Sequence, residues 1–212
     1  MTKRALIEHR PWLVAACFAA MLFYISQSQP VIAIPAKGAS CLALATYAWR
    51  RISGLDGRLL ATILAISALA DMGLERDIMI GTALFAIAQL IGIVFYLRHR
   101  RAPLPVSQIA AAWALTLLTP LLVWLPTQNI YVALYGMVLG VMSGLAWISV
   151  FSRYRVGIGV LLLIAAHTVL FAGWAGAVTT ETTTTLYWPV YFTGQLLIVV
   201  GIVRTFRAPT TQ

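Results

Sequence analysis

Apolar residues fill this chain in long runs, and only a few polar residues separate one run from the next. Eight runs have about the length of a membrane-spanning helix, which needs roughly 17–25 mostly apolar residues. The pattern predicts an all-α polytopic transmembrane bundle of eight helices that forms a single integral membrane domain over residues 1–212. We expect the helices at about 11–27, 31–49, 59–73, 78–97, 106–125, 130–151, 156–178 and 186–206.

The third run, 59–73, is shorter than its neighbours and carries Asp71 near its end. At about 1.5 Å per residue, a helix of this length spans less than the hydrocarbon core. We therefore expect Asp71 near a membrane boundary or in a locally thinned region that water can reach. Four residues further on, Glu75 belongs to the short turn that follows.

Composition excludes a soluble domain, because 61% of the residues are hydrophobic and only 10% are charged. A soluble protein has about 25% charged residues. No polar stretch approaches the roughly 50 residues of a separate small domain. Both cysteines, Cys17 and Cys41, lie in apolar runs, so the sequence indicates neither a disulfide nor a metal framework.

The chain has a net charge of +9, and its basic residues lie in alternate connections between the apolar runs. The positive charge is therefore explained by membrane orientation, and it does not indicate a nucleic-acid partner. Lys37 and Arg76 are the two of fifteen lysines and arginines that depart from this alternation. The positive-inside rule then predicts eight spans with both termini cytoplasmic, as in a multi-pass protein of the bacterial plasma membrane. The basic connections carry Lys3, Arg4, Arg10, Arg50, Arg51, Arg58, Arg98, Arg100, Arg101, Arg153, Arg155, Arg204 and Arg207. The outer connections are 28–30, 74–77, 126–129 and the threonine-rich 179–185.

Two further patterns predict packing and membrane contact. Gly136, Gly140 and Gly144 recur every four residues, which favours close contact with a neighbouring helix. Tyr187 and Trp188 lie near the end of a run, where aromatic side chains are typical of the membrane interface.

Polar residues inside the runs concentrate in their outer halves, across five helices. Polar groups are costly in hydrocarbon, so their common depth predicts a layer that lines a cavity opening to the outer side. Each member also has a structural interpretation, such as a lysine that reaches the headgroups, an interfacial acid, or hydrogen bonds between helices. The layer comprises Lys37, Asp71, Gln89, His167, Tyr191 and Gln195.

The motifs around these residues resemble those of the YhhN-like lysoplasmalogenase family, eight-span proteins that include ether-lipid hydrolases. The resemblance runs from about the second helix to the eighth, and His167 stands where the family has a second aspartate. The motifs are PAKGASCLALA with Lys37, SALAD with Asp71, GTALFAIAQ with Gln89, GVLLLIAAHTVLFAG with His167, and YFTGQLLIVVG with Tyr191 and Gln195.

The resemblance implies hydrolysis of the vinyl ether of a lysoplasmalogen to a fatty aldehyde and a glycerophospho-alcohol. Such a reaction needs a general acid that protonates the vinyl carbon and a base that activates water. The resemblance suggests Asp71 as the acid, His167 as the water-activating residue, and Lys37 as the ligand of the substrate phosphate. Gln89, Tyr191 and Gln195 would bind or orient the substrate.

Other interpretations of the same layer stay open. If Lys37 pairs directly with Asp71, the carboxylate remains ionised, and the hypothesis is that a phosphate engages Lys37 and frees the acid. A non-enzymatic binder or transporter of an amphiphile or ion would use the same residues, as would a hydrolase of a different lipid bond. The expected partners are a lysophospholipid-like lipid and the bilayer. We expect no cofactor and no metal, because Asp71 and His167 are only two candidate ligands.

Overall fold

The computed structural model describes residues 10–207, which form eight α-helices and one short π-helical turn. The predicted all-α class is confirmed. The helices are α2 (Arg10–Ile25), α3 (Pro30–Arg51), α4 (Gly54–Leu74), α5 (Ile78–Arg98), α6 (Val106–Thr127), α7 (Ile130–Trp147), α8 (Ile158–Trp174) and α9 (Thr180–Arg207), with the π-turn η1 (Arg153–Gly157) directly before α8.

Seven of these helices, α3 to α9, are long and apolar enough to cross a membrane, with η1 extending α8. The protein is therefore an integral multi-pass membrane protein by helix length and hydropathy. The helix α2 is also apolar but has 16 residues. At 1.5 Å per residue it is about 24 Å long, compared with a hydrocarbon core of about 30 Å. The chain turns at residues 26–29, and Pro30 starts α3 at a helix position that tolerates proline.

The prediction of a short third helix is wrong. The helix α4 begins at Gly54, which has a φ of +75°, and Asp56 lies in the first turn, where an acid is favourable. The hydropathy pattern identifies only the apolar part of a helix, so it does not include the first turn of α4. With 21 residues the helix is about 31 Å long, so no thinned region is needed. Asp71 lies one turn before its end.

The threonine-rich connection predicted at 179–185 is also wrong over most of its length. The helix α9 begins at Thr180, and the Thr182 amide donates a hydrogen bond of 3.1 Å to the Thr179 hydroxyl. Such a side-chain cap satisfies an N–H group that has no partner within the helix. Before this turn, α8 ends at Trp174 instead of residue 178, and Gly176 adopts a φ of +72°.

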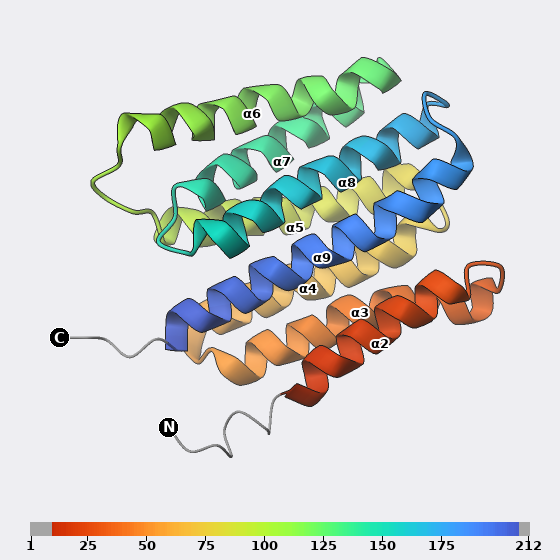
Figure 1. The fold of residues 1–212 in the computed structure, drawn as a ribbon, viewed down its shortest axis with the longest axis horizontal. Helices are drawn as coiled ribbons and strands as arrows, with labels where there is room; N and C mark the ends of the chain where they lie inside the picture. Colours follow the sequence, from red (N-terminus) through yellow and green to blue (C-terminus); the bar gives the residue numbers. More distant parts are fainter. Residues whose placement is uncertain (1–9, 208–212) are drawn as a thin grey trace. The chain divides into compact units, whose positions relative to one another are not determined.

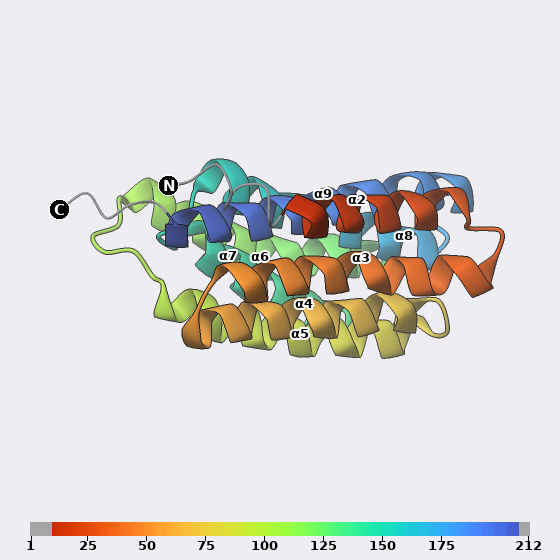
Figure 2. The same cartoon turned by 90° about the horizontal axis from the view of Figure 1, so that it is seen from below.

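The chain divides into two compact units, Met1–Gly92 and Ile93–Gln212, and the division falls within α5. In the N-terminal unit, α2 packs on α3 and α3 packs on α4, with short turns between them (Figures 1 and 2). A Cβ atom at Gly38 would lie 2.8 Å from the Met72 sulfur, so the glycine allows α3 to approach α4 closely. The single integral domain stays a prediction.

In the C-terminal unit, α6 packs on α7 and α8 packs on α9 (Figure 1). The glycines of α7 face α6, because a Cβ atom at Gly140 would lie 2.7 Å from the Thr116 carbonyl oxygen. One at Gly144 would lie 2.7 Å from the Ala112 carbonyl oxygen. The predicted close contact along this glycine face is confirmed.

An aromatic cluster joins three chain segments at one end of the C-terminal unit. The rings of Phe95 and Phe151 stack with their centroids 5.6 Å apart, and the rings of His99 and Phe206 are 5.4 Å apart. The segments after α5, before η1 and at the end of α9 therefore meet, and their arginines gather at this basic end. Which side of the membrane this end faces stays a prediction.

Candidate functional site

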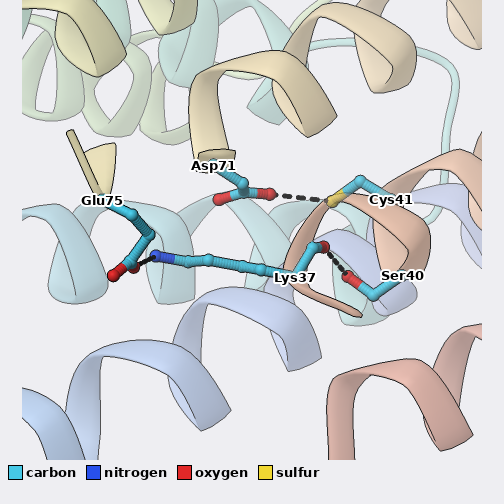
Figure 3. Close-up of polar contacts among 5 residues, drawn as sticks. All are labelled: Lys37, Ser40, Cys41, Asp71 and Glu75. Carbon is cyan, nitrogen blue, oxygen red and sulfur yellow. Dashed lines mark hydrogen bonds and ion pairs between the residues drawn. The ribbon is translucent and has the colours of Figure 1, made fainter. Parts of the chain in front are cut away.

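Lys37 lies two turns into α3, and its side chain is only 3% exposed. It runs alongside α4 and forms an ion pair with Glu75, with Nζ 2.6 Å from Oε1 (Figure 3). The ring of Phe23 on α2 lies 4.9 Å from the same ammonium group. The alternative in which Lys37 reaches the lipid headgroups is therefore wrong, because its ammonium group is buried beside a carboxylate.

Asp71 is completely buried, and its Oδ2 accepts a hydrogen bond of 3.2 Å from the Cys41 thiol (Figure 3). Cys41 is itself completely buried. The thiol is a weak donor, so it orients the carboxyl group without supplying a full counter-charge. The adjacent Ser40 hydroxyl donates to the Lys37 carbonyl oxygen at 2.7 Å.

The two contacts follow from the antiparallel packing of α3 and α4. Lys37 and Cys41 are four residues apart on α3, and Asp71 and Glu75 are four residues apart on α4, so each pair shares one helix face. One turn along α3, from Lys37 to Cys41, corresponds to one turn back along α4, from Glu75 to Asp71. We call these four residues the N-terminal cluster.

Sequence reasoning missed two members of this cluster. Cys41 was interpreted as an apolar residue and Glu75 as part of a turn, whereas Glu75 is the C-cap of α4 and its side chain is 35% exposed. The four-residue spacing from Lys37 and Asp71 was the available signal. Gln89 is buried on α5 at 7% exposure, and in the described N-terminal unit its side chain forms no hydrogen bond with the cluster.

His167 lies on α8 in the C-terminal unit and is 1% exposed. Its Nδ1 is 2.8 Å from the Leu163 carbonyl oxygen. Because a carbonyl oxygen only accepts, Nδ1 carries the hydrogen, and Nε2 is then the acceptor of the neutral ring. This tautomer leaves Nε2 as the nitrogen that can take a proton.

Three tyrosines surround the His167 ring, at centroid distances of 5.5 Å for Tyr135, 6.3 Å for Tyr187 and 5.8 Å for Tyr191. The Gln195 amide donates a hydrogen bond of 3.2 Å to the Tyr191 hydroxyl, so the predicted common face of these two residues is present. We call this group the C-terminal cluster.

Tyr135 carries no signal in the hydropathy pattern, and Tyr187 and Trp188 were predicted to lie at the membrane interface. Tyr187 is 6% exposed and Trp188 is 2% exposed, so their interfacial assignment is wrong. The signal for Tyr187 was its four-residue spacing from Tyr191 and Gln195, which continues one helix face.

The predicted polar layer thus forms one buried cluster in each unit. Lys37 and Asp71 belong to the first, with Cys41 and Glu75. His167, Tyr191 and Gln195 belong to the second. A shared cavity stays a prediction. Within residues 10–207, no group of three or more His, Cys, Asp and Glu residues is arranged to hold a metal ion.

The helices and their buried polar residues define an all-α, multi-pass membrane protein with buried polar side chains inside its spans. The chain belongs to the YhhN family, which it matches over residues 31–202. The matched region begins in the first turn of α3 and ends within α9, so it includes both clusters. Comparison with curated proteins and with solved structures gave no match.

Proposed function

We propose that the protein is an intramembrane lipid hydrolase of the lysoplasmalogenase type, which cleaves a vinyl ether to a fatty aldehyde and a glycerophospho-alcohol. The YhhN family includes lysoplasmalogenases. The observation that carries the proposal is a completely buried carboxyl group, Asp71, one helical turn from the ion pair that the buried Lys37 forms with the partly exposed Glu75. A general acid must hold a proton that it can deliver to the substrate, and we propose this role for the Asp71 carboxyl group.

In the proposed reaction, Asp71 donates a proton to the vinyl carbon that lies further from the ether oxygen. The double bond is lost, and the other carbon becomes an oxocarbenium ion, which the new carboxylate stabilises. Water adds to this carbon and loses a proton to a base, for which we propose Nε2 of His167. The bond from the hemiacetal carbon to the glycerol oxygen then breaks, and this oxygen takes the proton held by His167. The hemiacetal hydroxyl loses its proton to the Asp71 carboxylate as the aldehyde forms, so both residues return to their starting states. One water molecule is consumed.

Lys37 is proposed to bind the phosphate of the substrate, as an ammonium group that acts as a point charge. The hypothesis from the sequence was that a phosphate engages Lys37 and frees Asp71. Because Lys37 forms its ion pair with Glu75, we now propose a different exchange. The substrate phosphate competes with the Glu75 carboxylate for Lys37, instead of releasing Asp71 from the lysine. Glu75 is about one-third exposed, so its carboxylate can be hydrated when the phosphate replaces it.

The remaining predicted residues orient the substrate in this proposal. Tyr191 and Gln195 present a hydroxyl and an amide from one face of α9, and Gln89 presents an amide from α5. We also propose that the chain lies in the bacterial plasma membrane with both termini cytoplasmic. Lys37 and Asp71, near the ends of their helices remote from Arg50 and Arg51, then lie toward the outer side.

The proposal is tested with purified protein and lysoplasmalogen, with the aldehyde measured by mass spectrometry. General acid–base catalysis contributes roughly 10²–10⁴-fold to a rate, so we expect Asp71→Asn to reduce aldehyde formation by about 100-fold or more. We expect His167→Gln to reduce it as well. The control is Asp77→Asn, because Asp77 is exposed and its carboxylate caps the start of α5, where it accepts hydrogen bonds from the Met79 amide at 2.7 Å and the Ile80 amide at 3.1 Å. Unchanged turnover by Asp71→Asn would overturn the proposal.

The same assay separates the alternative functions. Lysophospholipid and ceramide are incubated in parallel with the vinyl-ether substrate. Fatty acid released from either one, without aldehyde from lysoplasmalogen, assigns the protein to a different lipid bond. Saturable binding of lysoplasmalogen without any product assigns it to the binders or transporters.

A further inference from the structure

The C-terminal unit contains a groove that the proposed reaction does not use. It lies between α6 and α7, near the start of α6, and has a volume of about 270 Å³. Ala112 and Thr116 line it where α6 approaches Gly144 most closely. Its walls are largely apolar and come from Ile109, Trp113, Val141, Leu145 and Ile148.

Arg100 and Leu104 complete the lining of this groove. Beside it lies a second, open hollow of about 360 Å³, which is lined by Arg100, Arg101, Ala102, Leu104 and Ile109. The two hollows share three residues, so an apolar groove continues into a space that two arginines border. A molecule occupying both would have an apolar tail and a negatively charged head.

The backbone holds these arginines at the groove. Arg100 pairs with Ser149 in an antiparallel bridge, and the Arg101 amide donates to the Ile148 carbonyl oxygen at 3.0 Å. The Arg101 guanidinium contacts the Val150 carbonyl oxygen at 3.4 Å. In the described part of the chain, no carboxylate forms an ion pair with Arg100 or Arg101.

The acidic residues of the sequence explain this lack of a counter-charge. From residue 93 to residue 212 the sequence contains one acid, Glu181. It lies in the first turn of α9, whereas Arg204 and Arg207 lie in the last turn, at the basic end. A helix of 28 residues is about 42 Å long, so Glu181 is remote from the arginines of the groove.

The exposure of α6 indicates what lies against it. Only 17% of the most apolar 18-residue stretch of α6 is buried, compared with 39% to 61% of the corresponding stretches in the other spans. Trp113 is 61% exposed although it borders the groove. An apolar face of this kind on a membrane-spanning helix is in contact with lipid.

We propose that the groove between α6 and α7 is a binding site for an anionic phospholipid. The phosphate pairs with Arg100 and Arg101, since arginine binds phosphate with two parallel hydrogen bonds. One acyl chain lies along Trp113 in the groove. A volume of about 270 Å³ is slightly below the 300–1,000 Å³ of a small-molecule pocket, which suits part of one chain.

Charge favours a lipid over a second copy of this chain. Two copies that met at this end would bring arginines together, and the C-terminal unit has no acid there to offset them. Basic pockets between membrane helices commonly bind the headgroups of anionic lipids. This site uses none of the residues of the N-terminal or the C-terminal cluster, so it stands independently of the proposed hydrolase.

The groove contains its own reporter, because brominated acyl chains quench tryptophan fluorescence on contact. The full chain is placed in phosphatidylcholine nanodiscs that contain increasing brominated phosphatidylglycerol or, separately, brominated phosphatidylcholine. The Trp113 signal is the difference between the wild type and Trp113→Phe. We expect phosphatidylglycerol to quench it at about 30-fold lower mole fraction, as two arginines at a membrane surface would give.

Two pairs of variants test where the lipid lies. We expect Arg100→Gln/Arg101→Gln to remove the preference for phosphatidylglycerol, whereas the charge-matched control Arg204→Gln/Arg207→Gln retains it. We expect Val141→Phe to fill the groove and reduce the quenching, whereas Leu134→Phe, on an exposed part of α7, does not. Size-exclusion chromatography monitors the folding of every variant.

Three results would overturn the proposal. One is equal quenching of the wild type by the two lipids. Another is an equal loss of preference in both double-arginine variants, which would indicate general surface charge. The third is a stable dimer in which Trp113 is protected from both lipids, which would assign this face to a second copy of the chain.

Discussion

Removing either partner of the ion pair between Lys37 and Glu75 should destabilise the protein, but by different amounts. Lys37 is 3% exposed and Glu75 is 35% exposed, so the two charges differ in their access to water. Glu75→Gln leaves a buried ammonium group without its carboxylate. Lys37→Met removes the buried charge, keeps most of the side-chain volume, and leaves a carboxylate that water can still reach.

The magnitude follows from the separation of 2.6 Å. Two unit charges at this distance attract by about 1.6 kcal/mol at the dielectric constant of water and by about 6 kcal/mol at an effective value of 20. Removal of one partner from a fully buried pair costs about 3–5 kcal/mol. Since Glu75 is partly hydrated, we expect Glu75→Gln to reduce the free energy of unfolding by about 2–3 kcal/mol. We expect Lys37→Met to reduce it by about 1 kcal/mol or less.

The assay is reversible unfolding in mixed micelles, followed by circular dichroism, for both single variants and for Lys37→Met/Glu75→Gln. The double variant should be more stable than Glu75→Gln alone, because it also removes the buried ammonium group that has lost the Glu75 carboxylate. Equal losses in the two single variants, or strictly additive losses in the double variant, would refute this reasoning. Turnover adds a second readout: the KM for lysoplasmalogen should fall in Glu75→Gln and rise in Lys37→Met if phosphate competes with Glu75.

Three further predictions concern other parts of the molecule. Cys41→Ala should lower kcat for aldehyde formation several-fold, while Cys41→Ser retains more of it, because serine keeps a donor for Asp71; equal kcat values would remove Cys41 from the positioning of the acid. Gly140→Leu should lower the melting temperature by several degrees, because its Cβ atom would lie 2.7 Å from the Thr116 carbonyl oxygen; Leu134→Phe, exposed on the same helix, is the control and should be neutral. In a cysteine-free background, an impermeant maleimide applied to intact cells should label Thr182→Cys and not Tyr154→Cys, since both positions are exposed and lie at opposite ends of their unit; the reverse labelling would invert the predicted orientation.

The sequence by itself determined the helices and the polar residues that they bury. Apolar runs about as long as the hydrocarbon core is thick have few stable alternatives to a helix. The helix α5 accordingly begins and ends within one residue of its predicted limits. Lys37, Asp71 and His167 stood out for the same reason, because polar groups are rare and costly in such runs. All three residues are buried, with exposed fractions of 2%, 0% and 1% for the whole residues, as that expectation requires.

Helix ends were less predictable from hydropathy. The first turns of α4 and α9 are polar, and their helical state depends on backbone conformation at Gly54 and on a hydroxyl cap at Thr179. These are local effects in the first turn, where side chains satisfy free N–H groups. A pattern of apolar residues carries no information about them.

Only the tertiary structure decided which groups meet. Glu75 as the partner of Lys37 and Cys41 as the donor to Asp71 depend on the rotation and axial position of α3 against α4. That register is set by side-chain packing across the whole contact, including the close approach of Gly38 to Met72. The groove beside Arg100 likewise requires the packing of α6 on α7 and the bridge from Arg100 to Ser149. Spacing along one helix indicates a shared face, but the packing of separate helices determines what that face contacts.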